Sequence, residues 1–383
     1  MIIGIDASRA FLRRRTGIEE YSYQIIRHLR NVLQNETVVL YVRKKFIFQS
    51  GQLRCIIPSI DFELPPHWQV KGLWAPRFWT QMRLSLEMLL HPPTVLFIPA
   101  HTVPLIHPER TVVTIHGLEY EFSPESYHFL ERLYMRWSIR YSVRVARRVI
   151  AVSENTKRDL VRLYGVPETK MTVVYEGVSN DHLESRIQSL GSSPQFKFQD
   201  SKYFLFIGRL ETRKNIVRMI EAFERFKQKM GLPHILILAG KRGYGYEDIR
   251  IKILDSQFKN EIYEVGYITE EEKFSLLKNA DIFLFPSLYE GFGLPVLEAQ
   301  QAGVPIITAD TSSLPEIAGE GAILVDPLST EALAAAMEAL VQNPEKRADI
   351  IEKATRNADR FDWAQCAREV AQLLLSPKNS SPS

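Results

Sequence analysis

Residues 286–303 read PSLYEGFGLPVLEAQQAG, and this stretch decides which fold the chain can adopt. It follows the apolar run DIFLFP (281–286) and precedes VPIITAD (304–310), which opens on a second such run. Short apolar runs between turn residues are typical of buried strands. Pro295 suits the first turn of a helix, and Gly303 suits its end. The stretch therefore predicts a strand, a loop with two glycines and a helix, in that order.

The predicted loop and the start of the helix have the composition of an anion site. Gly291 and Gly293 lack a Cβ atom, so the backbone there can come close to a ligand. The N–H groups at a helix N-terminus carry partial positive charge and most often bind phosphate. Glu298, in the first turns of the helix, can accept hydrogen bonds from a ribose diol, which would leave Glu290 at a reacting sugar. Glycine-rich turns also occur without any ligand, so the loop by itself is a weak signal.

A second polar loop strengthens the case for a ligand site. The segment FLFIGRLETRKN (204–215) places Arg209 and Lys214 just after another apolar run. These cations are the groups that a diphosphate would need. Exposed basic loops are common, but ligands of open α/β sheets bind beyond the carboxyl ends of the strands. Because both loops follow strands, we expect them to share one site.

Apolar runs of this kind alternate with amphipathic helical patterns along the whole chain. The alternation predicts βαβ units and an α/β fold with mostly parallel sheets. A stretch rich in Ser, Gly, Pro and Gln, SRIQSLGSSPQFKFQD (185–200), interrupts the series and is typical of a linker. The expected strands lie at 1–6, 37–42, 94–99, 111–116, 148–153, 171–176, 203–208, 234–240, 261–266, 281–286, 304–308 and 322–326.

The alternation divides the chain into two Rossmann-like domains. We expect an N-terminal domain at 1–182, a linker at 183–201 and a C-terminal domain at 202–358. Residues 359–383 hold a last amphipathic pattern, which we expect to form a helix that crosses back to the N-terminal domain, and a frayed tail. A length of 383 residues agrees with two cores rather than one.

The bulk composition excludes several classes of protein. No apolar run reaches the roughly 20 residues of a membrane-spanning helix, and the N-terminus does not resemble a signal peptide. Cys55 and Cys366 lie far apart and form no metal-binding pattern, which favours a reduced, cytoplasmic location. The net charge is +3, with an excess of Lys and Arg before residue 181 and an excess of Asp and Glu after it. A basic front half suits an anionic ligand or an acidic membrane surface, although a solvated basic surface is the commoner explanation.

With these residues in place, the chain resembles a family-4 retaining glycosyltransferase with the GT-B fold, of the bacterial mannosyltransferase-like kind. The family implies two Rossmann-like domains that face each other across a cleft, with the acceptor on the N-terminal side and the nucleotide sugar on the C-terminal side. The resemblance covers nearly the whole chain and rests on TGIEEY (16–21), TIHGLEY (114–120), AVSENTKRDL (151–160), YEGV (175–178), GRLETRKN (208–215), GYITEEE (266–272), SLYEGFGLPVLEA (287–299) and SLPEIAGEGAILVDP (313–327).

The resemblance implies a role for each residue that matches the family pattern. Arg209 and Lys214 would bind the diphosphate, Glu298 the ribose, and His116 the donor sugar. The implied catalytic set is Glu290, His116, Arg209 and Lys214. The implied donor-binding set is Gly17, Arg209, Lys214, Gly266, Tyr267, Ile268, Glu290, Gly291, Phe292, Gly293, Leu294 and Glu298.

The resemblance also implies a reaction. A hexose would pass from a nucleotide diphospho-sugar, GDP-mannose first, to a glycan or lipid-linked acceptor in cell-surface polysaccharide synthesis. The anomeric configuration would be retained. The chain contains no Asp-x-Asp pair of the kind that holds a metal in other transferases, so we expect the cations to replace a metal and no cofactor to be needed. No role for nucleic acid is expected.

Two departures from the family pattern stand out. Members commonly read His-Asp where this chain reads His116-Gly117, and Asn-Gly-Val where it reads Glu176-Gly177-Val178. The first departure removes a carboxylate near the proposed sugar site. It weakens any inference about sugar specificity.

Other functions remain in competition. An NAD-dependent dehydrogenase would need Gly-x-Gly-x-x-Gly after an early strand, and a P-loop NTPase would need Gly-Lys-Ser/Thr; neither is present. A sugar-nucleotide epimerase or a non-catalytic nucleotide-sugar-binding protein of the same fold stays open.

The segment HWQVKGLWAPRFWTQMRLSLEMLL (67–90) mixes tryptophans with basic residues. Such a mixture can dock on a membrane interface, where a lipid-linked acceptor would be found. Its apolar positions mostly keep helical spacing, which favours core packing of a helix behind an aromatic entry loop. Peripheral membrane contact is therefore the second of two interpretations.

Overall fold

The chain folds into two compact units, each built around one sheet. The first unit comprises residues 1–118, 129–177 and the C-terminal residues from Asp362, and the second comprises residues 119–128 and 178–361. The computed structural model describes the backbone alone for residues 45–49 and 52–56, and it describes the full residues for 1–12, 15–44, 57–75, 78–178, 198 and 201–376.

An eight-stranded sheet forms the centre of the first unit. Its strands follow the order β3-β2-β1-β5-β6-β7-β8, and β4 pairs with β2 outside this path. All pairs are parallel except β2 with β3. The strands are β1 (Ile2–Asp6), β2 (Thr37–Gln49), β3 (Gln52–Ile56), β4 (Trp68–Trp74), β5 (Val95–Ile98), β6 (Thr111–Ile115), β7 (Arg148–Ala151) and β8 (Met171–Val173). The six strands expected before residue 182 are confirmed.

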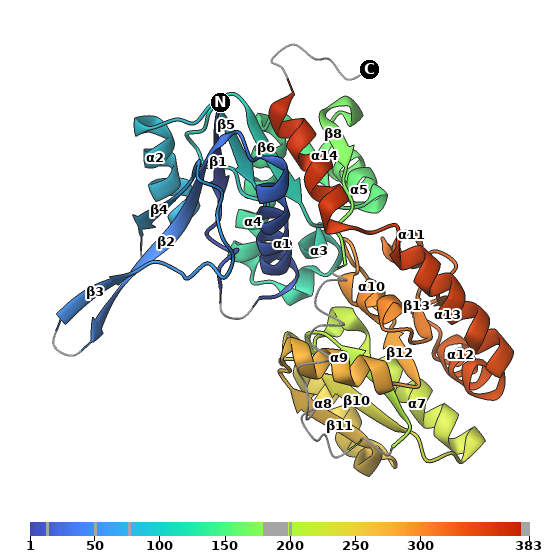
Figure 1. The fold of residues 1–383 in the computed structure, drawn as a ribbon. Helices are drawn as coiled ribbons and strands as arrows, with labels where there is room; N and C mark the ends of the chain where they lie inside the picture. Colours follow the sequence, from blue (N-terminus) through green and yellow to red (C-terminus); the bar gives the residue numbers. More distant parts are fainter. Residues whose placement is uncertain (13–14, 50–51, 76–77, 179–197, 199–200, 377–383) are drawn as a thin grey trace. The chain divides into compact units, whose positions relative to one another are not determined.

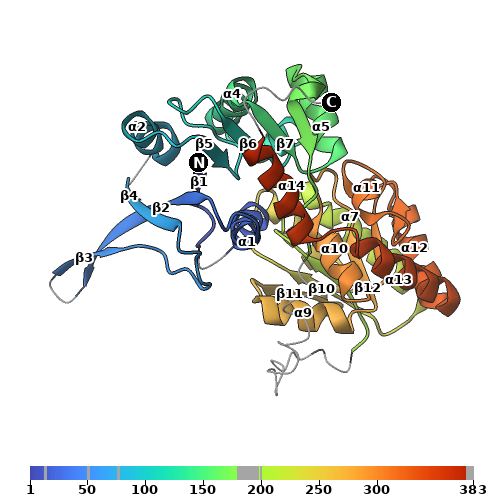
Figure 2. The same cartoon turned by 45° about the horizontal axis from the view of Figure 1, so that its top comes forward.

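The sheet differs from the expectation at one end. The start of segment 67–90 is not an entry loop, because β4 runs parallel to β2 with Val38 opposite Trp68 and Lys44 opposite Trp74. Pairing with β2 satisfies the backbone of β4 and buries Trp68 and Leu73. Past Lys44, β2 continues into an antiparallel hairpin with β3, which extends from the sheet in Figures 1 and 2.

Helices cover both faces of this sheet. Figure 2 shows α1 and α14 on one face and α2 and α4 on the other. The amphipathic pattern of α1 buries Tyr21, Ile25 and Leu29 at four-residue spacing, and α1 packs against α14 (Figure 1). The helices are α1 (Gly17–Val32), the π-helical turn η1 (Trp79–Leu84), α2 (Ser85–Leu90), α4 (Phe129–Val145), α5 (Glu154–Tyr164), the 3-10 turn η3 (Glu168–Lys170) and α14 (Trp363–Leu375).

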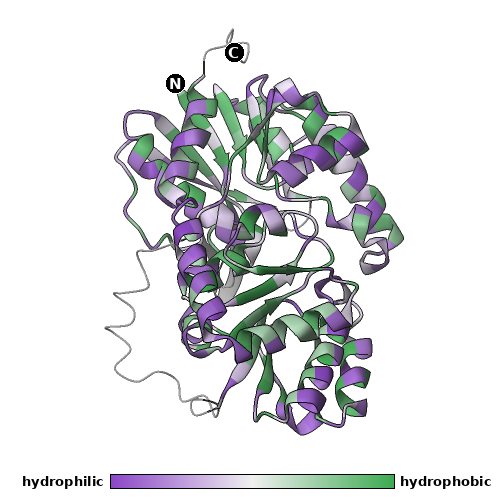
Figure 3. Cartoon of the chain, turned by 90° about the vertical axis from the view of Figure 1, so that its right-hand side faces the viewer, coloured by the Kyte–Doolittle hydropathy of each residue, from purple (hydrophilic) through white to green (hydrophobic). Residues whose placement is uncertain are grey.

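A six-stranded, all-parallel sheet forms the centre of the second unit, with the order β11-β10-β9-β12-β13-β14. Its strands carry continuous apolar residues, such as Phe204, Leu205 and Phe206, because helices cover both faces. Figure 3 shows most strands of both sheets largely in the hydrophobic colour. The strands are β9 (Tyr203–Ile207), β10 (Ile235–Ala239), β11 (Ile262–Gly266), β12 (Ile282–Phe285), β13 (Ile306–Ala309) and β14 (Ile323–Val325), at the six expected places.

The helices of the second unit include one short segment that sequence alone assigned to the N-terminal domain. Residues 119–128, with α3 and η2, group with the second unit, where the Phe122 ring stacks on that of Tyr289 at 4.1 Å between centroids. The helices are α3 (Glu119–Phe122), η2 (Pro124–Ser126), η4 (Thr212–Lys214), α7 (Ile216–Met230), α8 (Tyr246–Asp255), η5 (Lys259–Glu261), α9 (Glu270–Asn279), α10 (Leu294–Gln301), α11 (Leu314–Ala318), α12 (Thr330–Gln342) and α13 (Pro344–Ala358).

The remaining boundary expectations concern the linker and the C-terminus. The linker expected at 183–201 lies outside the described residues, apart from Phe198 and Ser201, and so does the tail after residue 376. The last helix, α14, belongs to the first unit. Among the residues that the structure describes, no helix combines the length and the hydropathy required to cross a bilayer.

Candidate donor site of the second unit

Three loops converge at one edge of the second sheet. Strands β9, β12 and β13 are neighbours and run parallel, so their carboxyl ends meet at the same edge. The loops that follow them are 208–215, 286–293 and 310–313. The Leu288 N–H donates to the Arg213 carbonyl at 2.9 Å, and the Asn215 amide donates to the Pro286 carbonyl at 3.1 Å. These bonds fasten the first loop to the second.

A buried ion pair joins these two loops. Lys214 Nζ lies 2.5 Å from Glu290 Oε1, and the two side chains are 10% and 11% exposed. Arg213 Nη1 lies 3.2 Å from the same carboxylate oxygen. Asn215, which follows Lys214, has φ +61° and ends the η4 turn. In this turn the side chains of Arg213 and Lys214, which are consecutive in sequence, both reach Glu290. In a regular strand, consecutive side chains would point to opposite faces.

Arg213 is the centre of a wider network. Its guanidinium lies 2.8 Å from Glu211 Oε1 and donates to the Tyr289 carbonyl at 2.6 Å. Burial alone would lower the pKa of Arg213, but the carboxylates of Glu290, Glu119 and Glu211 raise it. Arg213 is therefore a permanently charged group that holds the loop of Glu290 in place.

The network also sets the protonation of its other members. Burial alone would raise the pKa of Glu290, but Lys214 and Arg213 lower it to about 2. Burial and the neighbouring Arg213 lower the pKa of Lys214, and burial raises that of Glu119. Glu290 is thus an anion at every physiological pH. Lys214 is a cation whose charge is costly to keep without an anionic partner.

Two serines from the third loop fix the backbone of Glu290. The Glu290 N–H donates to Ser312 Oγ at 3.0 Å. The Ser313 hydroxyl lies 3.0 Å from the Glu290 carbonyl oxygen and 2.6 Å from that of Phe292. The side chain of Glu290 and its peptide are therefore both held before any ligand arrives.

The glycine loop leads directly into α10. Gly293 precedes Leu294, the first residue of α10, and has φ +121°, which side chains rarely adopt. A Cβ atom at Gly293 would also lie 3.1 Å from a methyl group of Leu314. Pro295 is in the first turn and Gly303 follows the last, as the sequence predicts. The first N–H groups of α10 therefore face the loop of residues 290–293.

The second acid, Glu298, lies on α10 and is bound by a lysine that the sequence did not single out. Lys273 Nζ, on α9, lies 2.6 Å from Glu298 Oε1 and 2.7 Å from Glu270 Oε2. Burial alone would lower the pKa of Lys273, but these two carboxylates raise it. Lys273 fixes one oxygen of Glu298, so Glu298 is a preoriented hydrogen-bond acceptor.

Arg209 and residues 266–268 lie at the same sheet edge in more exposed positions. The Arg209 side chain is 61% exposed, and its Nε lies 3.8 Å from Glu211 Oε2. Gly266 ends β11 with φ +74°, and the exposed ring of Tyr267 lies under the ammonium group of Lys241 at 4.9 Å. Ile268 packs against the core of the unit.

The two remaining predicted residues, Gly17 and His116, belong to the first unit. Gly17 is the first residue of α1, and a Cβ atom there would meet no atom within 4 Å. His116 follows β6 and is buried, with Nδ1 3.0 Å from Glu176 Oε1 and Nε2 2.8 Å from the Pro99 carbonyl oxygen. Both ring nitrogens of His116 therefore have partners within the first unit.

Known families match this arrangement of two α/β units. A model of glycosyltransferase family 4 matches residues 15–182, and one of glycosyl transferases group 1 matches residues 167–357. The chain belongs to glycosyltransferase family 4. O-antigen chain mannosyltransferase B of Escherichia coli is 27% identical to this glycosyltransferase over 92% of the chain and 94% of that protein.

Solved structures show that this glycosyltransferase has the GT-B fold. WaaG, a glycosyltransferase involved in lipopolysaccharide biosynthesis, superposes with a TM-score of 0.70 at 15% identity, covering 98% of this chain and 100% of WaaG. HepE from Anabaena, solved with UDP and glucose, superposes with a TM-score of 0.68 at 18% identity, covering 98% of this chain and 99% of HepE.

Sequence reasoning missed several members of the site. Arg213 adjoins Lys214, and a pair of cations after a strand is a signal, but only the loop conformation shows which side chains turn inward. Lys273 gives no signal, because lysines in the first turns of surface helices are common. The missed residues are Glu119, Glu211, Arg213, Lys273, Ser312 and Ser313.

The lowered pKa of Glu290 makes a prediction about stability. Because this pKa is about 2 in the folded protein instead of 4.5, ionised Glu290 stabilises the second unit above pH 4.5, and the contribution is lost as the pH falls from 4.5 to 2. We expect Glu290→Gln to lower the free energy of unfolding by up to about 3 kcal/mol at pH 6 and by much less near pH 2.5. Urea unfolding followed by circular dichroism measures both values.

A matched control is Glu352→Gln, which removes a carboxylate paired with Arg356 on the surface of the same unit, where the two side chains are 71% and 67% exposed. Its effect should stay within about 1 kcal/mol at both pH values. All five tryptophans lie in the first unit. A transition that changes the circular dichroism but not the tryptophan fluorescence is therefore the unfolding of the second unit. A Glu290→Gln effect that does not shrink at low pH would contradict the proposed ionisation.

Proposed function

We propose that this glycosyltransferase moves a hexose, most readily mannose, from a nucleotide diphospho-sugar to a glycan or lipid-linked acceptor in cell-surface polysaccharide synthesis. GDP-mannose is the proposed donor. The observation that carries the proposal is the buried contact of Lys214 with Glu290 beside the glycine loop and the start of α10. The name of the E. coli relative, a mannosyltransferase of the O-antigen chain, supports mannose over other hexoses.

The network around Glu290 suits the departure of a diphosphate. In the proposed reaction the bond from the anomeric carbon to the diphosphate oxygen breaks and negative charge grows on the diphosphate. Lys214, exposed Arg209 and the first N–H groups of α10 would stabilise this charge. Burial lowers the pKa of Lys214. An anion that binds beside this lysine would raise the pKa again and favour the charged form.

Retention and independence of metal ions are part of the proposal. The acceptor oxygen would bond to the anomeric carbon on the face that the diphosphate leaves, and its proton would pass to a diphosphate oxygen. The charge that a metal supplies in other transferases would come from Arg209 and Lys214. Glu290 would lie against the sugar, while Glu298, oriented by Lys273, would accept hydrogen bonds from the ribose. The backbone of residues 266–268 would contact the base.

Thermal unfolding in the presence of candidate donors tests this function first. A ligand that binds the folded protein raises its melting temperature, so GDP and GDP-mannose should raise it more than adenine nucleotides do. Transfer to a mannose-containing acceptor should persist in EDTA. The transfer rate should fall about 100-fold or more in Glu290→Ala, because the variant loses a contact that stabilises the transition state. Glu352→Ala, at an exposed carboxylate of the same unit, is the control and should keep wild-type activity.

Other outcomes of this test would overturn the proposal. Binding without transfer or hydrolysis would point to a sugar-binding protein, and interconversion of the donor sugar would point to an epimerase. Loss of activity in EDTA that Mg²⁺ restores would contradict independence of metal.

We also propose that the enzyme works in the cytoplasm, in peripheral contact with an acidic membrane. Segment 67–90 packs Trp68, Trp79 and Leu84 into the core but leaves apolar side chains exposed from the end of β4 to the end of α2. A second such group lies on α4. The exposed members are Trp74, Phe78, Met82, Leu86, Leu89, Leu90, Phe129, Leu130, Leu133, Tyr134 and Trp137.

The loop between β5 and β6 connects these two groups. The Ile106 N–H lies 3.4 Å from Ser85 Oγ of α2, and the Tyr141 hydroxyl of α4 donates to the Leu105 carbonyl at 3.0 Å. Leu105 and Ile106 are themselves exposed. Farther along α4, Arg140 and Arg144 are exposed as well. Apolar side chains with adjacent arginines favour the interface of an anionic bilayer.

Sedimentation with lipid vesicles tests this contact. The wild-type protein should bind vesicles that contain phosphatidylglycerol at low salt and bind pure phosphatidylcholine weakly. Replacing Phe129 and Leu133 with Ser should reduce binding roughly tenfold or more, because each inserted side chain is worth about 1.5–3 kcal/mol. Replacing the exposed Ile251 and Leu254 of α8 with Ser is the control. Absence of wild-type binding to acidic vesicles would overturn the proposal.

A further inference from the structure

His116 is held by two hydrogen-bonding partners that come from neighbouring strand ends. Pro99 follows β5, His116 follows β6 and Glu176 lies just beyond β8, so all three stand at the carboxyl edge of the first sheet. The distances are 3.0 Å from Nδ1 to Glu176 Oε1 and 2.8 Å from Nε2 to the Pro99 carbonyl oxygen. The histidine and glutamate side chains are only 7% and 4% exposed.

The partners of the ring fix where its hydrogens lie. A carbonyl oxygen can only accept, so Nε2 carries a hydrogen in this arrangement. One further proton lies between Nδ1 and the Glu176 carboxylate, whichever of the two atoms it is bonded to. Nε2 is therefore the hydrogen-bond donor of the ring. In histidines generally, the partner of one ring nitrogen determines whether the other nitrogen carries a hydrogen.

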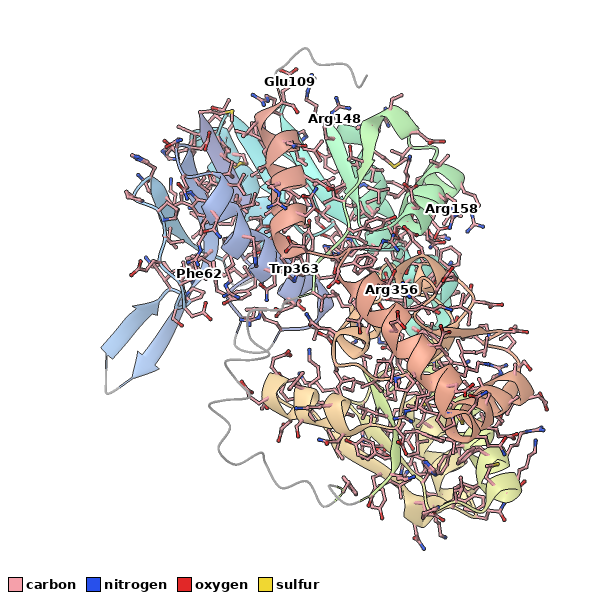
Figure 4. The ribbon with its side chains drawn as sticks, turned by 45° about the vertical axis from the view of Figure 1, so that its right-hand side comes forward. Phe62, Glu109, Arg148, Arg158, Arg356 and Trp363 are labelled. Atoms are coloured by element: carbon pink, nitrogen blue, oxygen red, sulfur yellow. The ribbon has the colours of Figure 1, made fainter. Side chains whose placement is uncertain are left out.

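The surroundings keep both members of the pair in one orientation. The Tyr21 ring meets His116 edge-on at 4.6 Å between centroids, and the His101 ring does so at 5.2 Å. Beyond Glu176, a Cβ atom on Gly177 would lie 2.2 Å from the backbone nitrogen of Trp363, so glycine lets the start of α14 cross directly over this strand end. Figure 4 shows Trp363 at that end of α14.

The pair connects the two departures from the family pattern noted in the sequence. The first departure, Gly117, leaves no carboxylate next to His116, and its φ of +149° is unfavourable for any side chain. The second departure, Glu176, brings a carboxylate onto the same imidazole from 60 residues away. The carboxyl group that is missing beside the histidine in sequence is therefore supplied beside it in space.

We propose that Glu176 is a positioning residue for His116. Glu176 fixes the orientation of the imidazole and leaves Nε2–H as its donor group. This role rests on the proposed function, to which His116 would contribute the sugar contact that the family resemblance implies. Glu176 itself touches no substrate, so its effect on the reaction passes entirely through the ring.

A double-mutant cycle tests the proposal. Glu176→Leu keeps roughly the size of the side chain and removes the hydrogen bond to Nδ1, and it should lower kcat/KM for transfer about tenfold to a hundredfold, the range for a misplaced functional group. Most of the loss should be in kcat rather than in KM for the donor. In a His116→Ala background, the same change should cost less than about twofold, since the ring through which it acts is absent. Glu176→Asp, which keeps the carboxyl group, should recover part of the activity.

Glu87→Gln is the matched control. Glu87 is another buried glutamate of the first unit, with His91 Nδ1 3.3 Å from its Oε1 and Arg83 3.3 Å from its Oε2. Its loss should lower the midpoint of the tryptophan-monitored unfolding transition without changing kcat. If Glu176→Leu is merely a structural change, it should behave like this control.

The outcomes separate the inference from the function on which it rests. A folded Glu176→Leu enzyme with wild-type kcat/KM, or effects of Glu176→Leu and His116→Ala that simply multiply, would overturn the role of Glu176 and leave the transferase assignment standing. Absence of transfer by the wild-type protein with every nucleotide sugar would overturn the function and the inference together. In that case, a coupling of the two residues in tryptophan-monitored unfolding would still show that the pair forms.

Discussion

The buried contact of Lys214 and Arg213 with one carboxylate of Glu290 is the constraint on which the second unit's site depends. Burial of three charged groups costs desolvation free energy. The cost is offset only when the charges are paired and their remaining donors and acceptors form hydrogen bonds. Here those bonds come from three strand ends: the Tyr289 carbonyl meets Arg213, and Ser312 meets the Glu290 peptide. The site is therefore rigid before a ligand binds, which electrostatic stabilisation of a reaction requires.

The rest of the site follows from this constraint. The Ser313 hydroxyl bonds the carbonyls of Glu290 and Phe292 and so holds the glycine loop, and α10 begins where that loop ends. Glu298 then lies one turn into α10, within reach of Lys273. In the first unit, the imidazole of His116 and the carboxyl group of Glu176 come from two strand ends and meet at the sheet edge. In both units a buried polar group finds its partner in a distant part of the chain.

The sequence predicted the parts of the fold that local pattern determines. Apolar runs bounded by turn residues located the inner strands, and Pro295 and Gly303 located α10. Strands β3 and β4 were missed because QLRCI and WQVKGLW have mixed composition, and only their pairing with β2 makes them strands. The grouping of residues 119–128 with the second unit depends on contacts such as Phe122 with Tyr289, which no local pattern encodes.

The candidate site shows the same division. The motif spacing selected Lys214, Glu290 and Glu298, because residue types at strand ends are visible in sequence. It could not show that Arg213 turns inward while Arg209 stays exposed, since the difference depends on contacts of Arg213 with Glu290 and the Tyr289 carbonyl, which lie far away in sequence. A crystal structure of the protein with GDP bound tests the account most directly. The account predicts β-phosphate oxygens within hydrogen-bonding distance of Lys214 Nζ and of the N–H groups of residues 291–294; a diphosphate bound elsewhere, without contact to Lys214 or Arg209, would contradict it.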